Sequence, residues 1–159
     1  MNLYIREEAS GDYRVASTRE VTAAARACVG RLFRRGRSIK KPADAAELFV
    51  GKLASLDAER FAVLFMDHQH RVIQYEELFF GTIDAASIHP REVIKRALHH
   101  NAATVLFAHN HPSGDTTPSR ADELITTRLK EALGLVDVRV LDHFIVGEGY
   151  TSLVERGLL

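Results

Sequence analysis

The residues best suited to chemistry lie in one short stretch, FAHNHPSGDTTPSRAD, which spans residues 107–122. It places two histidines one residue apart, His109 and His111, ahead of a turn, and Ser119 and Asp122 follow. Residues i and i+2 of an extended chain point to the same side, so the two imidazoles should converge. Zinc commonly binds neutral histidine nitrogen together with a carboxylate and water. The stretch therefore favours a zinc site, with Asp122 brought back over the strand end by the turn.

Each part of the stretch also has a purely structural explanation. PSGD is a good turn by itself. Ser119-x-x-Asp122 is a helix capping box, in which Ser119 caps the helix and Asp122 is the reciprocal acceptor. Capping accounts for these two residues, yet nothing in it requires His-x-His. Because the chain has a single cysteine, Cys28, any zinc site must use histidine and carboxylate.

The spacing of these residues resembles the JAMM motif of MPN-domain zinc metalloproteases and isopeptidases: His-x-His, seven residues, Ser, two residues, Asp. The wider sequence resembles the RadC-type branch in GTIDAASIHPREV, AHNHPSGDTTPSRAD and VRVLDHFIVG. The resemblance covers about residues 42–159. It implies an MPN domain that holds one zinc ion per chain through His109, His111, Asp122 and water, and that hydrolyses an amide bond in a protein or peptide.

The JAMM pattern also has a glutamate well upstream, at the head of the first core strand. Glu59, in LDAERFAVLF, occupies that place fifty residues before His109, and Glu76 and Glu77 on the neighbouring strand are the alternatives. The resemblance implies that Glu59 is the general base, which takes a proton from zinc-activated water and passes it to the leaving amine. It also implies that Ser119 hydrogen-bonds the developing oxyanion.

Two other polar residues of this region keep two interpretations each. His143 is either a residue that supports a metal ligand or a hydrogen-bonded core histidine. Asp115 either orients His109 or His111, or only stabilises its turn.

The elements around these residues indicate an α/β fold. Apolar runs predict buried strands, and amphipathic stretches predict helices between them. Strands are expected at 60–67, 72–80 and 103–109, one or two strands over 137–147, and a short one near 13–16. Helices are expected at about 19–34, 43–53, 90–101 and 119–133. This alternation predicts a three-layer α/β domain with a mixed sheet flanked by helices. We expect it to span residues 42–159, after an N-terminal extension, 1–41, made of a helix and a linker.

The extension carries most of the chain's charge asymmetry. Lys+Arg and Asp+Glu balance at 21 each, but residues 21–43 hold seven basic residues and no acid: Arg26, Arg31, Arg34, Arg35, Arg37, Lys40 and Lys41. Such a patch could meet phosphate or be a solvated helix face. RadC-type proteins carry a helix-hairpin-helix segment whose paired glycines are missing here. We therefore expect the short form of the family, with at most weak DNA contact through residues 26–41.

Cysteine usage and hydropathy favour a cytoplasmic protein. A single cysteine excludes a disulfide within the chain, the first residues do not read as a secretory signal, and the longest apolar run, FAVLFM, is too short to span a bilayer. Two alternatives to a zinc hydrolase remain open. One is a non-catalytic MPN scaffold, and the other is a nucleic-acid-binding accessory protein associated with DNA repair. Metal analysis and salt-dependent DNA binding separate the three.

Overall fold

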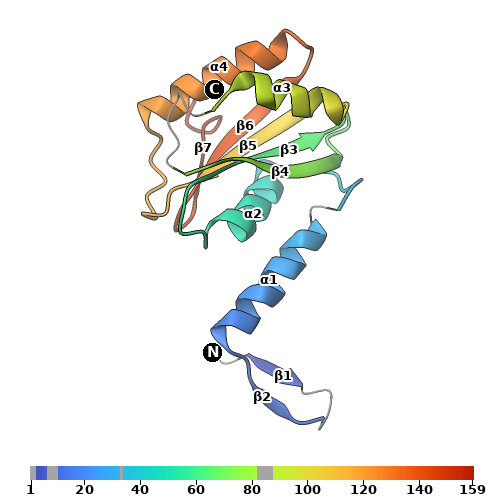
Figure 1. Ribbon diagram of the computed structural model, residues 1–159, viewed down its shortest axis with the longest axis vertical. Helices are drawn as coiled ribbons and strands as arrows, with labels where there is room; N and C mark the ends of the chain where they lie inside the picture. The colour runs from blue at the N-terminus through green and yellow to red at the C-terminus, as the bar shows by residue number, and fades with distance from the viewer. Residues whose placement is uncertain (1–2, 7–10, 33, 82–87) are drawn as a thin grey trace.

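The computed structural model describes residues 3–6, 11–32, 34–81 and 88–159. An N-terminal hairpin, β1 (Tyr4–Arg6) and β2 (Tyr13–Val15), leads into helix α1 (Thr18–Leu32), and these elements project from the rest of the molecule (Figure 1). The remaining elements are α2 (Pro42–Leu53), β3 (Arg60–Met66), β4 (Val72–Phe80), α3 (Pro90–His99), β5 (Thr104–Asn110), α4 (Arg120–Gly134), β6 (Arg139–Val146) and β7 (Tyr150–Ser152). None of the helices described is long and apolar enough to cross a membrane.

The main sheet has five strands in the order β4-β3-β5-β6-β7. Strand β3 pairs antiparallel with β4 and with β5, while β5 pairs parallel with β6, and β7 returns antiparallel to β6. Helix α2 covers one face, and α3 and α4 cover the other (Figure 1). The predicted three-layer α/β fold with a mixed sheet is therefore confirmed.

The core is divided between the two faces of the sheet because successive side chains of a strand point to opposite sides. Strand β3 is buried along both faces, which explains why its sequence is apolar without alternation. Its residues Ala62, Leu64 and Met66 pack with the apolar side of α2. Phe61, Val63 and Phe65 pack on the other face, among the apolar residues of β5, α3 and α4.

Some boundaries differ from the sequence prediction, for local reasons. Strands β1 and β7, of three residues each, were not expected, whereas β2 matches the short strand expected near 13–16. The segment expected to be a linker also joins the sheet edge. The amide of Gly36 donates to the carbonyl of Val72 at 2.7 Å, the amide of Val72 donates to Arg37 at 2.8 Å, and Ile39 enters the core.

The turn after β5 is held against the hairpin that joins β6 to β7. The amide of Glu148 donates to the carbonyl of Gly114 at 3.0 Å. Gly114 has φ 85°, a left-handed conformation that favours glycine. At Gly147 a Cβ would overlap the carbonyl group of Gly114, so this approach requires a residue without a side chain.

We therefore expect Gly147→Ala to destabilise the fold by about 1–3 kcal/mol, the usual cost of overpacking a tight contact. Chemical denaturation measures the change. Gly149→Ala is the matched control, since nothing lies within 4 Å of a Cβ built there. Equal stability of the two variants would contradict the close approach.

Candidate metal centre

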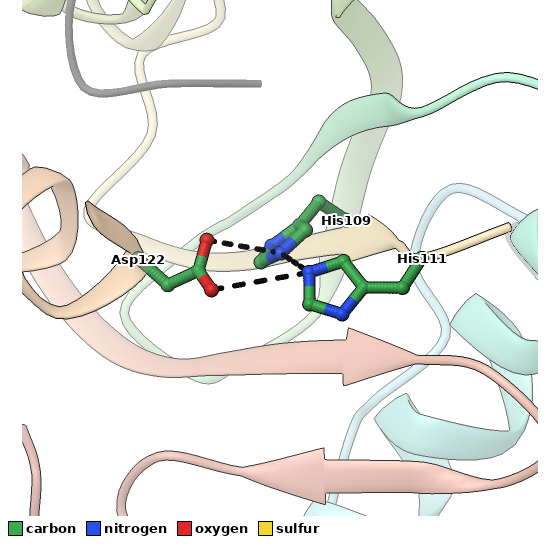
Figure 2. A group of neighbouring side chains, drawn as sticks. All are labelled: His109, His111 and Asp122. Atoms are coloured by element: carbon green, nitrogen blue, oxygen red, sulfur yellow. Dashed lines mark hydrogen bonds and ion pairs between the residues drawn. The ribbon is translucent and has the colours of Figure 1, made fainter. Parts of the chain in front are cut away.

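The three predicted ligands meet at one end of the sheet (Figure 2). His109 lies in β5, His111 directly follows that strand, and Asp122 lies in the first turn of α4. The Nε2 atom of His109 is 3.0 Å from Nε2 of His111 and 3.1 Å from Oδ1 of Asp122. His109 and Asp122 are buried, whereas 19% of the His111 side chain is exposed. The site is thus closed on one side and reachable through His111.

Helix capping places the carboxylate of Asp122. Its Oδ2 atom accepts hydrogen bonds from the amide of Ser119 at 2.7 Å and from the hydroxyl of Ser119 at 2.6 Å. In return, Oγ of Ser119 accepts from the amide of Asp122 at 3.2 Å. Oδ1 remains directed at His109. The capping box and the histidine cluster are therefore parts of one arrangement, in which each oxygen of Asp122 serves a different partner.

The surroundings of Asp122 keep it anionic at neutral pH. Burial alone would raise the pKa of Asp122, but the interactions with His109 and Ser119 outweigh burial and hold that pKa well below its usual range. The position in the first turn of α4 also favours negative charge, because the helix dipole is positive there. Asp122 can therefore supply a charged oxygen ligand.

A carbonyl group sets the orientation of the His111 ring. Nδ1 of His111 lies 2.8 Å from the main-chain oxygen of Asp115. Because a carbonyl can only accept, Nδ1 must carry the proton, and in the neutral ring Nε2 then has a free lone pair. The Asp115 carboxylate instead accepts from the amide of Thr117 at 2.9 Å, as in a turn. Asp115 thus contacts His111 through its main chain and stabilises the turn through its side chain.

His143 contacts the ring of His109 from the neighbouring strand. Nδ1 of His109 lies 2.9 Å from Nε2 of His143, whose Nδ1 lies 2.6 Å from the hydroxyl of Thr126. Burial holds the pKa of His143 well below its ordinary value, so the ring is neutral. His143 is therefore both fully buried and in contact with a candidate ligand, and the two sequence interpretations are not exclusive.

The donor set fits a divalent cation. Two imidazole nitrogens and a carboxylate oxygen face one another, and the candidate ligand atoms all lie within 4.8 Å of one another. Lone pairs at such distances repel unless a proton or a cation lies between them. Two histidines and one carboxylate form a common three-ligand set of zinc enzymes, which leaves a fourth position for water or substrate.

Glu59 lies at the same end of the sheet as this cluster. It directly precedes β3, whose residue Phe61 pairs with His109 of β5, so Glu59 stands two residues before the partner of a candidate ligand. The carbonyl of Glu59 accepts from the amide of Gly81 at 3.0 Å, and its side chain is half-buried.

The two alternative glutamates are placed differently. Glu77 lies opposite Ala62, on the α2 face of the sheet, and accepts from the hydroxyl of Tyr75 at 3.0 Å. Glu76 forms an ion pair with Arg96, which lowers its pKa, and lies 2.7 Å from His100. The catalytic role of Glu59 stays a prediction, but its place in the fold distinguishes it from both.

Sequence reasoning missed Asn110, the residue between the two histidines. It is buried, and its Oδ1 accepts from the amide of Arg60 at 2.8 Å. Its Nδ2 donates to the carbonyls of Leu56 and Ala58 at 3.3 and 3.2 Å. Asn110 thereby fastens the loop that carries Glu59 to the strand that carries the histidines. The signal that could have identified Asn110 is its position, as a polar residue between two candidate ligands at the end of a buried strand.

Comparisons with known proteins agree with the motif. A family model described as the RadC-like JAB domain matches residues 39–158. A UPF0758 protein of Nitrosococcus oceani is 61% identical over 127 residues, which are 79% of this chain and 57% of the relative. One of Thioalkalivibrio sulfidiphilus is 57% identical over 125 residues, 79% of this chain and 56% of the relative. One of Marinobacter nauticus is 48% identical over 157 residues, 98% of this chain and 70% of the relative. The chain thus spans little more than half the length of the first two relatives, and it belongs to the RadC-like JAB domain family.

Proposed function

We propose that this chain is a zinc-dependent amide hydrolase of the JAMM type, a metallopeptidase or isopeptidase. One observation carries the proposal: His109, His111 and Asp122 direct their ligand atoms at one point, at the end of the sheet where β3 begins after Glu59. A purely structural cluster would not need two imidazoles held with their Nε2 atoms 3.0 Å apart.

His109, His111 and Asp122 would hold the metal, and the part of His111 that is exposed marks the side from which substrate arrives. When bound, zinc supplies a Lewis acid that activates water and polarises a carbonyl group at neutral pH. The chain itself contributes the fixed orientation of the three ligands. His109 and Asp122 are buried, so substrate and water can reach the metal only from the side of His111.

Glu59 would move the proton. Its carboxylate takes a proton from the attacking water and delivers it to the nitrogen of the leaving amine, so the C–N bond breaks as an amine departs rather than an amide anion. The loop before β3 must hold this carboxylate in place, and the three hydrogen bonds of Asn110 support that loop.

Ser119 would donate to the oxyanion. Its hydroxyl donates to Oδ2 of Asp122 at 2.6 Å, so this role requires the hydroxyl to rotate toward substrate. The amide of Ser119 keeps its own bond to Oδ2 during that rotation, which leaves Asp122 anchored. The proposed substrate is a protein, peptide or isopeptide-linked conjugate.

The first test is metal content. We expect one zinc ion per chain in the wild type and almost none in His111→Ala, because only two of the three ligands remain. Elemental analysis of the purified proteins gives the ratio. His68→Ala is the control, as His68 is an exposed histidine in a turn. Unchanged zinc in His111→Ala would show that the proposed site is wrong.

The second test separates proton transfer from metal binding. Glu59→Gln should keep its zinc and lose hydrolysis by about 10²–10⁴-fold, the usual contribution of a general base. A panel of peptides and isopeptide-linked conjugates must first identify a cleaved substrate. Glu77→Gln is the matched control, since Glu77 lies on the α2 face. Full activity of Glu59→Gln would place the base elsewhere, and wild-type zinc without any cleavage would favour the scaffold.

The third test concerns the three hydrogen bonds by which Asn110 holds the loop before β3, called the Asn110 clamp below. Asn110→Ala removes three hydrogen bonds, so hydrogen exchange of residues 54–60 should accelerate, and hydrolysis should fall while zinc stays bound. Exchange followed by mass spectrometry measures the loop directly. Loss of zinc together with unchanged exchange would contradict the clamp, because Asn110 would then support the ligands and not the loop.

A further inference from the structure

A chain of three hydrogen bonds and one ion-pair contact begins and ends at Asp122. The hydroxyl of Thr126, one helical turn further along α4, lies 2.5 Å from the main-chain oxygen of Asp122 and 2.6 Å from Nδ1 of His143. Nε2 of His143 lies 2.9 Å from Nδ1 of His109. Nε2 of His109 then lies 3.1 Å from Oδ1 of Asp122. Each of these four residues is buried.

The directions of the three hydrogen bonds that join Asp122, Thr126, His143 and His109 follow from the first of them. A main-chain carbonyl can only accept, so the single hydroxyl proton of Thr126 goes to Asp122. The oxygen of Thr126 must then accept from His143, which places the proton of that ring on Nδ1. A neutral imidazole has one N–H group, so Nε2 of His143 is an acceptor, and Nδ1 of His109 must donate to it.

We propose that His143, oriented by Thr126, is a positioning residue that holds the proton of His109 on Nδ1 and so directs the Nε2 lone pair of His109 toward the metal. The inference rests on the proposed zinc site. Metal-ligating histidines usually donate their second N–H to a carboxylate, carbonyl or water. Here a buried imidazole takes that part, so the partner of His109 Nδ1 is a neutral ring and not a carboxylate.

Packing alone does not require this arrangement. The His143 ring fills an apolar pocket, with ring centroids 5.5 Å from Phe61 and 5.9 Å from Phe107. A leucine would suit that pocket better than a glutamine if filling space were the only task. A positioning role predicts the reverse, because glutamine keeps an acceptor oxygen near the place of Nε2 and leucine does not.

The test compares zinc affinities in two matched pairs of variants, measured by competition with a chromophoric chelator. His143→Leu and Thr126→Val should bind zinc about 10–100-fold more weakly, whereas His143→Gln and Thr126→Ser should stay within about threefold of the wild type. The Thr126 pair keeps the test decisive if His143→Leu does not fold. Affinity in His143→Leu equal to or above that in His143→Gln would overturn the proposal.

A second readout needs neither zinc nor activity. Long-range ¹H–¹⁵N correlation spectra of the metal-free wild type should show protons on Nδ1 of His143 and Nδ1 of His109, and a bare Nε2 on His143. The His143 signals are assigned by their disappearance in His143→Gln. A proton on Nε2 of His143 would refute this inference even if zinc binds. A wild type with the expected protonation but no zinc affinity would instead refute the proposed function, and with it the task given to His143.

Discussion

The carboxylate of Asp122 is the point on which the rest of the site depends. Its two oxygens have different partners: Oδ2 accepts from Ser119, which caps α4, and Oδ1 faces the imidazole of His109. The start of the helix and the position of the histidines are therefore fixed together. A shift of α4 along its axis would lose both the cap and the convergence of ligand atoms, and the apolar packing of Ile125 and Leu129 against the sheet resists that shift.

The strand order explains why such distant residues meet. Because β5 lies between β3 and β6, the end of one central strand receives Glu59 from one side and the ring of His143 from the other. The parallel pairing of β5 with β6 places Phe107 beside His143, so His143 faces α4 and Thr126. The mixed sheet brings these residues together because β3 is antiparallel to β5, so the first residues of β3 lie beside the last residues of β5.

The sequence was informative where chemistry is local and uninformative where it depends on neighbours in space. His109, His111, Ser119 and Asp122 stand in a short motif with a fixed spacing, so they could be named in advance, and the buried strands followed from their apolar runs. Glu59 could be named only through the resemblance to a family.

The supporting residues could not be recognised in the same way. Thr126 and Asn110 have ordinary sequence contexts, and their partners lie 17 and 50 residues away. His143 was left with two interpretations, because only the packing of β6 beside β5 brings its ring to His109. The short strands β1 and β7 were not predicted for a related reason. They are defined by pairing with a neighbouring strand and not by a hydrophobic pattern in their own sequence.

The alternation of side chains along β5 has one more consequence. His109 and His111 face α4, whereas Asn110 between them faces the loop before β3, so a single tripeptide serves both sides of the sheet. A one-residue slip in a strand exchanges its two faces. Insertion or deletion of one residue within β5 would thus turn the imidazoles toward the loop and the amide toward the helix, with every residue type retained. The number of residues in this strand therefore matters to the site as much as the identity of its residues.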